Sequence, residues 1–234
     1  MRKYISLYTV IATIGLAAVL IGFLKTFIIP VTNATFHAPL IIYVHGFFTF
    51  SWIVFFLLQA YLIKAENWTL HMTMGMLGLL LALGVAGTIP FAGAYQVEKD
   101  LPQLGEASVS TVLGTTTAAL LFLGLVFAGL YYRDKPEVHK RLMMLATIAI
   151  LWPAWFRFRH YFPSVPNPEI WFAFVLADSL IIFAWIWEKI TNGRIHPTLL
   201  YVGSFVIAEH TFEIIAFDSS PWRAIARQLY TLFE

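Results

Sequence analysis

Residues 38–63 read APLIIYVHGFFTFSWIVFFLLQAYLI and contain no Asp, Glu, Lys or Arg. A bilayer hydrocarbon core about 30 Å thick needs about 20 apolar residues in a helix that rises about 1.5 Å per residue. This stretch of 26 residues is therefore long enough to cross a membrane as one helix. The fold class depends on how often such a stretch recurs along the chain.

The composition of the whole chain agrees with a membrane protein. Of its 234 residues, 59% are hydrophobic and 12% are charged, and the charged share is about half of that in soluble domains. The chain has no cysteine, which excludes disulfides, thiolate metal sites, iron–sulfur clusters and cysteine nucleophiles. A net charge of +2 is too small for a nucleic-acid-binding surface, so we expect no nucleic-acid partner.

Apolar runs of this length recur about seven times, and no linker or low-complexity stretch separates them. The predicted spans are Tyr4–Ile29, Ala38–Ile63, Leu70–Tyr95, Ser108–Tyr132, Val138–Phe158, Glu169–Glu188 and Pro197–Phe217. The tail Pro221–Phe233 alternates apolar and basic residues, which predicts an amphipathic helix on the membrane surface. The sequence thus predicts one all-α transmembrane domain over residues 1–234, embedded in the lipid bilayer.

The basic residues predict the orientation of this bundle. If the N-terminus is cytoplasmic, the inner segments hold Arg2, Lys3, Lys64, Arg133, Lys135, Lys140, Arg141, Lys189 and Arg194. The outer segments then hold Lys25, Lys99, Arg157, Arg159, Arg223 and Arg227. Because short cytoplasmic loops carry the excess of Lys and Arg, we predict a cytoplasmic N-terminus and an outer C-terminus.

Ionisable groups within the spans are the first candidates for function, since each is costly to place in a membrane. One group of such residues lies at comparable depth in the outer half of the membrane. His45 and His210, for example, are each roughly 10 Å inside the outer end of their span. Its members are His45, Asp178, Glu209, His210, Glu213 and Arg157. Imidazole and carboxylate ligands suit iron, zinc or copper, and two imidazoles suit a haem whose propionates an arginine binds. The same charges could instead pair with one another to fix the helix register.

A second candidate group is the pair His71 and His139 on the cytoplasmic side. Each residue opens a predicted span after a short cytoplasmic turn. The pair fits a bis-histidine haem site between spans three and five, or an entry point for protons. An interfacial histidine is also inexpensive without any ligand, and the adjacent Lys140 and Arg141 are typical of residues that set topology.

The order of these residues resembles a broad set of uncharacterised bacterial membrane proteins. The residues that carry the resemblance are His45, Gln59, Leu70-His71 with Gly75, His139-Lys140-Arg141-Leu142-Met143, and Arg157. They cover about residues 39–159, and Met72 departs from a pattern that has Arg at this position. The set looks architecturally like small haem-b membrane electron carriers but has no agreed activity. The resemblance implies a multi-pass protein of the bacterial inner membrane.

Three functional hypotheses follow. The first is a redox or electron-transfer protein that binds haem b, iron or zinc. In this hypothesis His45 and His210 are the ligands and Arg157 binds an anionic group. Ligands or proton carriers are also provided by Glu209, Glu213 and Asp178. The second is a non-enzymatic transporter or a structural subunit of a larger membrane complex. The third, a zinc hydrolase similar to seven-helix ceramidases, lacks the second histidine that such proteins carry on span seven. The sequence contains no phosphate-binding loop, dinucleotide-binding turn, HExxH or GxSxG motif.

Overall fold

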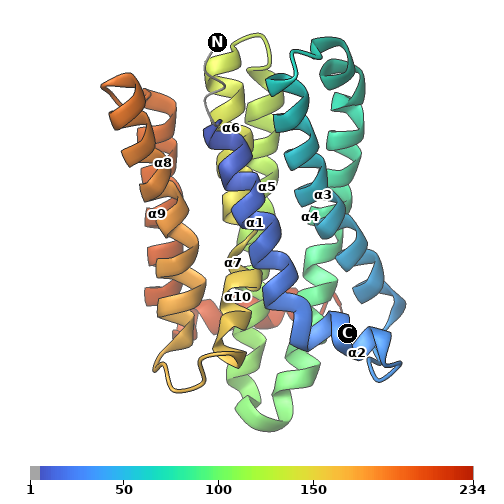
Figure 1. Ribbon diagram of the computed structural model, residues 1–234. Helices are drawn as coiled ribbons and strands as arrows, with labels where there is room; N and C mark the ends of the chain where they lie inside the picture. The colour runs from blue at the N-terminus through green and yellow to red at the C-terminus, as the bar shows by residue number, and fades with distance from the viewer. Residues whose placement is uncertain (1–5, 234) are drawn as a thin grey trace.

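The computed structural model describes residues 6–233, which form helices joined by short turns and loops and contain no strand (Figure 1). The long helices are α1 (Leu7–Phe23), α3 (Leu40–Lys64), α4 (Trp68–Leu104), α5 (Ser110–Tyr131), α6 (Pro136–Ala149), α8 (Ala177–Asn192) and α9 (Pro197–Ala216). Shorter helices are α2 (Ile29–Thr32), α7 (Trp152–Phe156) and α10 (Ser220–Tyr230). Two π-helical segments, η1 (Leu24–Ile28) and η4 (Glu169–Leu176), and two 3-10 turns, η2 (Gly105–Val109) and η3 (Arg157–His160), join them.

The helices run alternately up and down, so the connections gather at the two ends of the bundle (Figure 1). The N-terminal end, at the top of the figure, carries the turns α3–α4, α5–α6 and α8–α9. The far end carries the connections α1–α3, α4–α5, α7–α8 and α9–α10. Residues far apart in sequence therefore meet at either end.

Six helical segments of the described chain are long and apolar enough to cross a membrane, which supports a polytopic membrane protein. They are Leu7–Thr32, Leu40–Lys64, Trp68–Tyr131, Pro136–His160, Glu169–Asn192 and Pro197–Ala216. The third segment, 64 residues long, contains both α4 and α5, which turn back at η2 and pack against each other.

The segment Gln96–Ala107, which lies between the third and fourth predicted spans and was expected to be a loop, is helical in the structure. Helix α4 continues to Leu104 despite Pro90 and Pro102 within it, and η2 leads directly into α5. Prolines inside a transmembrane helix are tolerated because neighbouring groups satisfy the freed carbonyls. The first predicted span was placed from Tyr4, which lies outside the described residues, as do Arg2 and Lys3.

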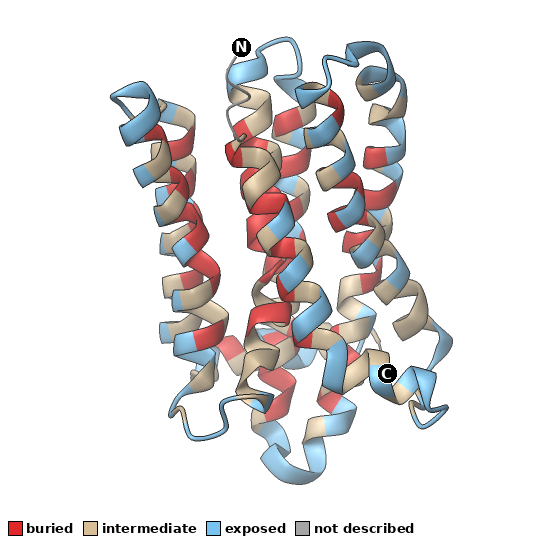
Figure 2. Ribbon diagram, viewed as in Figure 1, coloured by how far each residue is buried: buried red, intermediate tan, exposed pale blue. Residues whose placement is uncertain are grey.

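The core lies where α3, α5 and α6 face one another, and buried residues follow the inner faces of the helices (Figure 2). Trp52 of α3 packs edge-on against Phe122 of α5, with ring centroids 4.9 Å apart. Its Nε1 donates a hydrogen bond of 3.2 Å to Oγ1 of Thr147 on α6. This bond satisfies the one polar atom of the buried Trp52 ring, which therefore fills the centre of the bundle without an unpaired donor.

Helix α10 closes the far end of the bundle against α5. Trp222 is buried there, and its Nε1 donates to the carbonyl oxygen of Ser110 at 3.0 Å. Asp218 accepts a hydrogen bond from the Ser110 hydroxyl and pairs with Arg223. Hydrogen bonds from Arg223, and then from Ser110, hold the pKa of Asp218 below its ordinary value. Arg227 pairs with Glu106 of η2, so this tail is attached to the bundle at several points.

Candidate functional site

His71 and His139 lie close together at the N-terminal end of the bundle. Asn67 caps the start of α4, where its side chain accepts from the Leu70 N–H at 3.1 Å, and Pro136 begins α6. Each histidine therefore lies in the first turn of its helix. The two ring centroids are 6.4 Å apart and the ring planes are nearly perpendicular, at 83°. The structure thus brings this predicted pair together across α5, against which both helices pack.

The hydrogen bonding of this histidine pair leaves ring nitrogens free. Nδ1 of His139 lies 2.8 Å from the carbonyl oxygen of Gly129, and since a carbonyl only accepts, Nδ1 carries the proton of this hydrogen bond. Nδ1 of His71 is enclosed and has no hydrogen-bond partner. Gly75, one turn after His71, has nothing within 4 Å of the position that a Cβ would occupy. A side chain at position 75 would therefore meet no neighbour within van der Waals contact.

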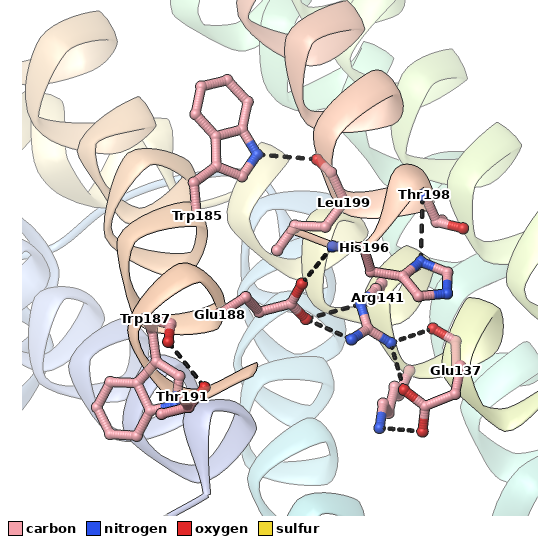
Figure 3. Close-up of polar contacts among 10 residues, drawn as sticks. Glu137, Arg141, Trp185, Trp187, Glu188, Thr191, His196, Thr198 and Leu199 are labelled. Carbon is pink, nitrogen blue, oxygen red and sulfur yellow. Dashed lines mark hydrogen bonds and ion pairs between the residues drawn. The ribbon is translucent and has the colours of Figure 1, made fainter. Parts of the chain in front are cut away.

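A buried ion-pair network near the same end connects α6, α8 and α9 (Figure 3). Nε and Nη2 of Arg141 lie 2.7 and 2.5 Å from Oε1 of Glu188, and Nη1 lies 2.7 Å from Oε2 of Glu137. Arg141 and Glu188 are only 4% and 2% exposed. Oε2 of Glu188 accepts from the backbone N–H of His196 at 2.8 Å. Burial, and then the positive charge of Arg141, lower the pKa of His196.

This network was missed by sequence reasoning, which interpreted Arg141 as a topology determinant. The helical spacing of apolar residues around Arg141 could have predicted the network. Arg141, Leu145 and Ile148 follow one another at i, i+4 and i+7, and all three are buried. An arginine on such an apolar helix face needs a buried acidic partner, and Glu188 ends the next predicted span along the chain.

The outer cluster, defined here as Asp178, Glu209, His210, Glu213 and Thr117, connects α8, α9 and α5 near the far end. Nδ1 of His210 lies 2.9 Å from Oδ1 of Asp178, and both residues are buried. Nε2 of His210 is 3.8 Å from Oε2 of Glu209, and both atoms are enclosed without a hydrogen-bond partner. Thr117 of α5 donates a hydrogen bond to Glu213. The four predicted residues of α8 and α9 therefore do come together.

His45 does not join this cluster. Its Nδ1 lies 2.9 Å from Oγ1 of Thr88 on α4, and the Thr88 hydroxyl donates onward to the carbonyl oxygen of Gly84 at 2.7 Å. The expected site that uses both His45 and His210 is not assembled, because His45 is bonded within the α3–α4 pair and His210 within the α8–α9 pair. Depth along a helix was the only basis for grouping them, and depth says nothing about which helices are neighbours.

Arg157, the predicted anion anchor, lies in η3, where α7 ends. Its Nη1 donates to the carbonyl oxygen of Pro153 at 2.7 Å, and its guanidinium lies 4.0 Å from the ring centroid of Phe23 on α1. None of the ion pairs between residues 6 and 233 includes Arg157. Its charge is therefore balanced neither by the outer cluster nor by another carboxylate in direct contact.

Within residues 6–233, no group of three or more His, Asp or Glu side chains is arranged to hold a metal ion. The outer cluster contains the right residue types, but its side chains do not converge on one point. A metal bound only by protein side chains is therefore not supported at this cluster.

Comparisons with protein-family models, curated proteins and solved structures found no match to this chain. The side-chain groups described above are therefore the features of the protein that indicate its function.

The Asp178–His210 pair predicts an ordered series of stabilities. Asp178→Ala leaves the His210 Nδ1–H buried without an acceptor, which should lower the free energy of unfolding by about 1–3 kcal/mol. Asp178→Asn should cost less because the amide oxygen still accepts from Nδ1. Unfolding in detergent measures both, with Ser179→Ala, an exposed neighbour on α8, as the control. Equal losses for the two Asp178 variants would show that this hydrogen bond contributes nothing.

Proposed function

We propose that the protein is a membrane electron-transfer protein that binds haem b between His71 and His139. The observation that carries this proposal is the separation of the two rings, 6.4 Å between centroids. A metal–imidazole nitrogen distance of about 2.0–2.1 Å places the centres of two imidazoles on opposite sides of one metal roughly 6.3 Å apart. The two values agree closely.

The donor set at this pair also fits haem better than a bare metal ion. Two imidazoles cannot complete the coordination of a free metal ion, whereas a porphyrin contributes four nitrogens and needs only two axial ligands. The bond from His139 Nδ1 to the Gly129 carbonyl is the outer contact that usually orients a ligating histidine. Nδ1 of His71 is enclosed and makes no side-chain hydrogen bond, so the ring is not tied to another side chain of the protein.

The chain's own residues would perform three tasks at this site. His71 and His139 hold the group from two helices, and the Gly129 carbonyl keeps the His139 ring in the orientation that presents Nε2. The core rings Trp52 and Phe122 lie beyond the pair, between α3 and α5, and exclude water from the centre of the bundle. Bound haem supplies a one-electron iron centre. The proposed activity is therefore electron transfer with a redox partner or another membrane subunit.

The proposed topology has seven crossings, a cytoplasmic N-terminus and an outer C-terminus. It is supported by the return of the chain at η2 within the 64-residue segment Trp68–Tyr131 and by the excess of Lys and Arg in the N-terminal-side turns. In this topology the His71–His139 pair lies on the cytoplasmic side, and α10 lies on the outer surface as an amphipathic helix. We propose the bacterial inner membrane as the location.

The test of this function is the absorption spectrum of the protein purified in detergent from cells supplied with a haem precursor. We expect a Soret band, a reduced-minus-oxidised difference spectrum of a six-coordinate b-type haem, and about one haem per chain by extraction. Folded protein that contains no haem above background would refute the proposal. Elemental analysis of the same sample separates haem iron from zinc or copper.

A transporter is the second candidate, because the outer cluster places three carboxyl groups and one imidazole inside the membrane-spanning region. Such groups mark ion or proton pathways in many membrane proteins. A folded protein without haem that moves protons or cations in liposomes would favour this candidate. The zinc hydrolase is not proposed, since catalytic zinc takes three protein ligands and the described residues contain no such group.

A further inference from the structure

A second feature of the far end is a concentration of basic side chains, separate from the histidine pair. The basic cluster is defined as Lys25 of η1 together with Arg157, Arg159 and His160 of η3. Gly22 brings the two segments together, because a Cβ at this position would lie 2.3 Å from the carbonyl oxygen of Ala154. Only glycine permits this approach of α1 to α7.

The arrangement of the basic cluster follows from that close approach. Nζ of Lys25 donates to the carbonyl oxygen of His160 at 3.1 Å and lies 4.2 Å from the ring centroid of Tyr161. Lys25, Arg157 and Arg159 are all within electrostatic range of the His160 ring, as is Lys99 of α4. Positive charge from three helical segments is therefore concentrated in one region.

Direct ion pairs with carboxylates do not balance this charge in the described residues. Among residues 6–233, no Asp or Glu lies within 4.0 Å of the charged atoms of Lys25, Arg157 or Arg159, and Asp100 of α4 is near Arg159 without forming an ion pair. The two arginines use aromatic rings and backbone carbonyls instead. Arg159 donates to the Phe156 carbonyl at 3.1 Å and lies over the ring of the same residue.

Most donors of these arginines have no acceptor within the protein. A guanidinium has five N–H groups, and the structure gives Arg157 and Arg159 one hydrogen bond each. Both residues lie at the end of a membrane-spanning segment, where arginine side chains can reach the headgroup region. A ligand with several negatively charged oxygens would supply both the acceptors and the charge.

We propose that the basic cluster binds the phosphate of an anionic phospholipid headgroup. Guanidinium groups bind phosphate oxygens in pairs, and a lysine adds a point charge. The cluster lies where spans end, which is the depth of headgroup phosphates. Leu24 and Phe162, next to it in sequence, are 40% and 52% exposed and offer an apolar surface for the acyl chains. This site is independent of haem.

The experiment compares the protein in nanodiscs of phosphatidylcholine alone with nanodiscs that also contain phosphatidylglycerol. We expect phosphatidylglycerol to raise the melting temperature of the wild type. The Arg157→Gln/Arg159→Gln variant loses two charge-assisted hydrogen bonds to the phosphate, so its affinity for phosphatidylglycerol should fall about tenfold or more. The rise in melting temperature that phosphatidylglycerol causes in the wild type should then disappear. Arg133→Gln/Lys135→Gln, which removes the same charge at the N-terminal end, is the matched control and should keep the shift.

Further arms separate the sources of the anion. Inorganic phosphate added to phosphatidylcholine nanodiscs should not raise the melting temperature. If phosphate does raise it, and the Arg157→Gln/Arg159→Gln variant abolishes this rise, the site binds a free anion. The lipid proposal would then be wrong. A shift that persists in this variant would show that the arginines only extend toward the headgroup region. If the control variant Arg133→Gln/Lys135→Gln lost the melting-temperature shift to the same extent, the shift would depend on the net charge of the protein and not on the basic cluster. Arg159→Gln, a half-buried position, serves if the double variant does not fold.

Discussion

Replacing His71 or His139 by alanine is expected to remove roughly nine-tenths or more of the bound haem, because in the proposed site each imidazole would supply one of the two protein ligands to the iron. The expected readout is loss of the Soret band per mole of folded protein, measured on detergent-purified variants beside the wild type.

Two histidines serve as controls for this prediction. His37→Ala changes an exposed histidine in the α2–α3 connection, and His45→Ala removes the hydrogen bond to Thr88; both variants should retain haem. Retention of haem in the His71 and His139 variants, together with its loss in His45→Ala and His210→Ala, would move the cofactor site to the outer half. Loss of haem in all variants alike would indicate a general folding defect.

Arg141→Met is expected to give the largest loss of stability among the variants considered, about 3–5 kcal/mol. It leaves the buried Glu188 carboxylate without its counter-charge. Glu188→Gln should be milder because Arg141 keeps Glu137, 2.7 Å from Nη1, and the side-chain amide oxygen introduced by the substitution can still accept from the His196 N–H. Chemical unfolding in detergent, monitored by helical circular dichroism, measures these differences.

The double variant Arg141→Met/Glu188→Gln separates charge from packing. If the uncompensated charge dominates, the double variant should recover roughly half or more of the stability that Arg141→Met loses. Lys140→Met, a neighbour that pairs with Glu137 nearer the surface, should change stability by only about 0–1 kcal/mol. A double variant as unstable as Arg141→Met alone would contradict an electrostatic role for the pair.

The positions of the polar groups suggest a division of tasks along the bundle. The His71–His139 pair and the Arg141–Glu188 network lie toward the N-terminal end, whereas the outer cluster and the basic cluster lie toward the far end. The network holds the α8–α9 hairpin to α6, and the outer cluster connects the same hairpin to α5. Stability measurements on the Arg141 and Asp178 variants therefore report on the attachment of one hairpin at two depths.

Sequence reasoning predicted the helical spans because their cause is local. A run of about 20 apolar residues must satisfy its backbone hydrogen bonds within itself when it lies in lipid, and only a helix does so in a single segment. His71 and His139 were found for a related reason, since each opens a helix after a short turn at the same end. Antiparallel neighbours with short turns place such residues at equal depth.

The sequence by itself determined the all-helical membrane class, the approximate spans and which ionisable residues lie within them. Only the tertiary structure decided which of these residues meet. His45 bonds to Thr88 instead of approaching His210, and Arg141 turns inward to Glu188 instead of facing the membrane surface. The physical reason is that hydropathy sets depth along each helix, whereas helix packing, through contacts such as Gly22 against Ala154, sets the neighbours and the side that each residue faces.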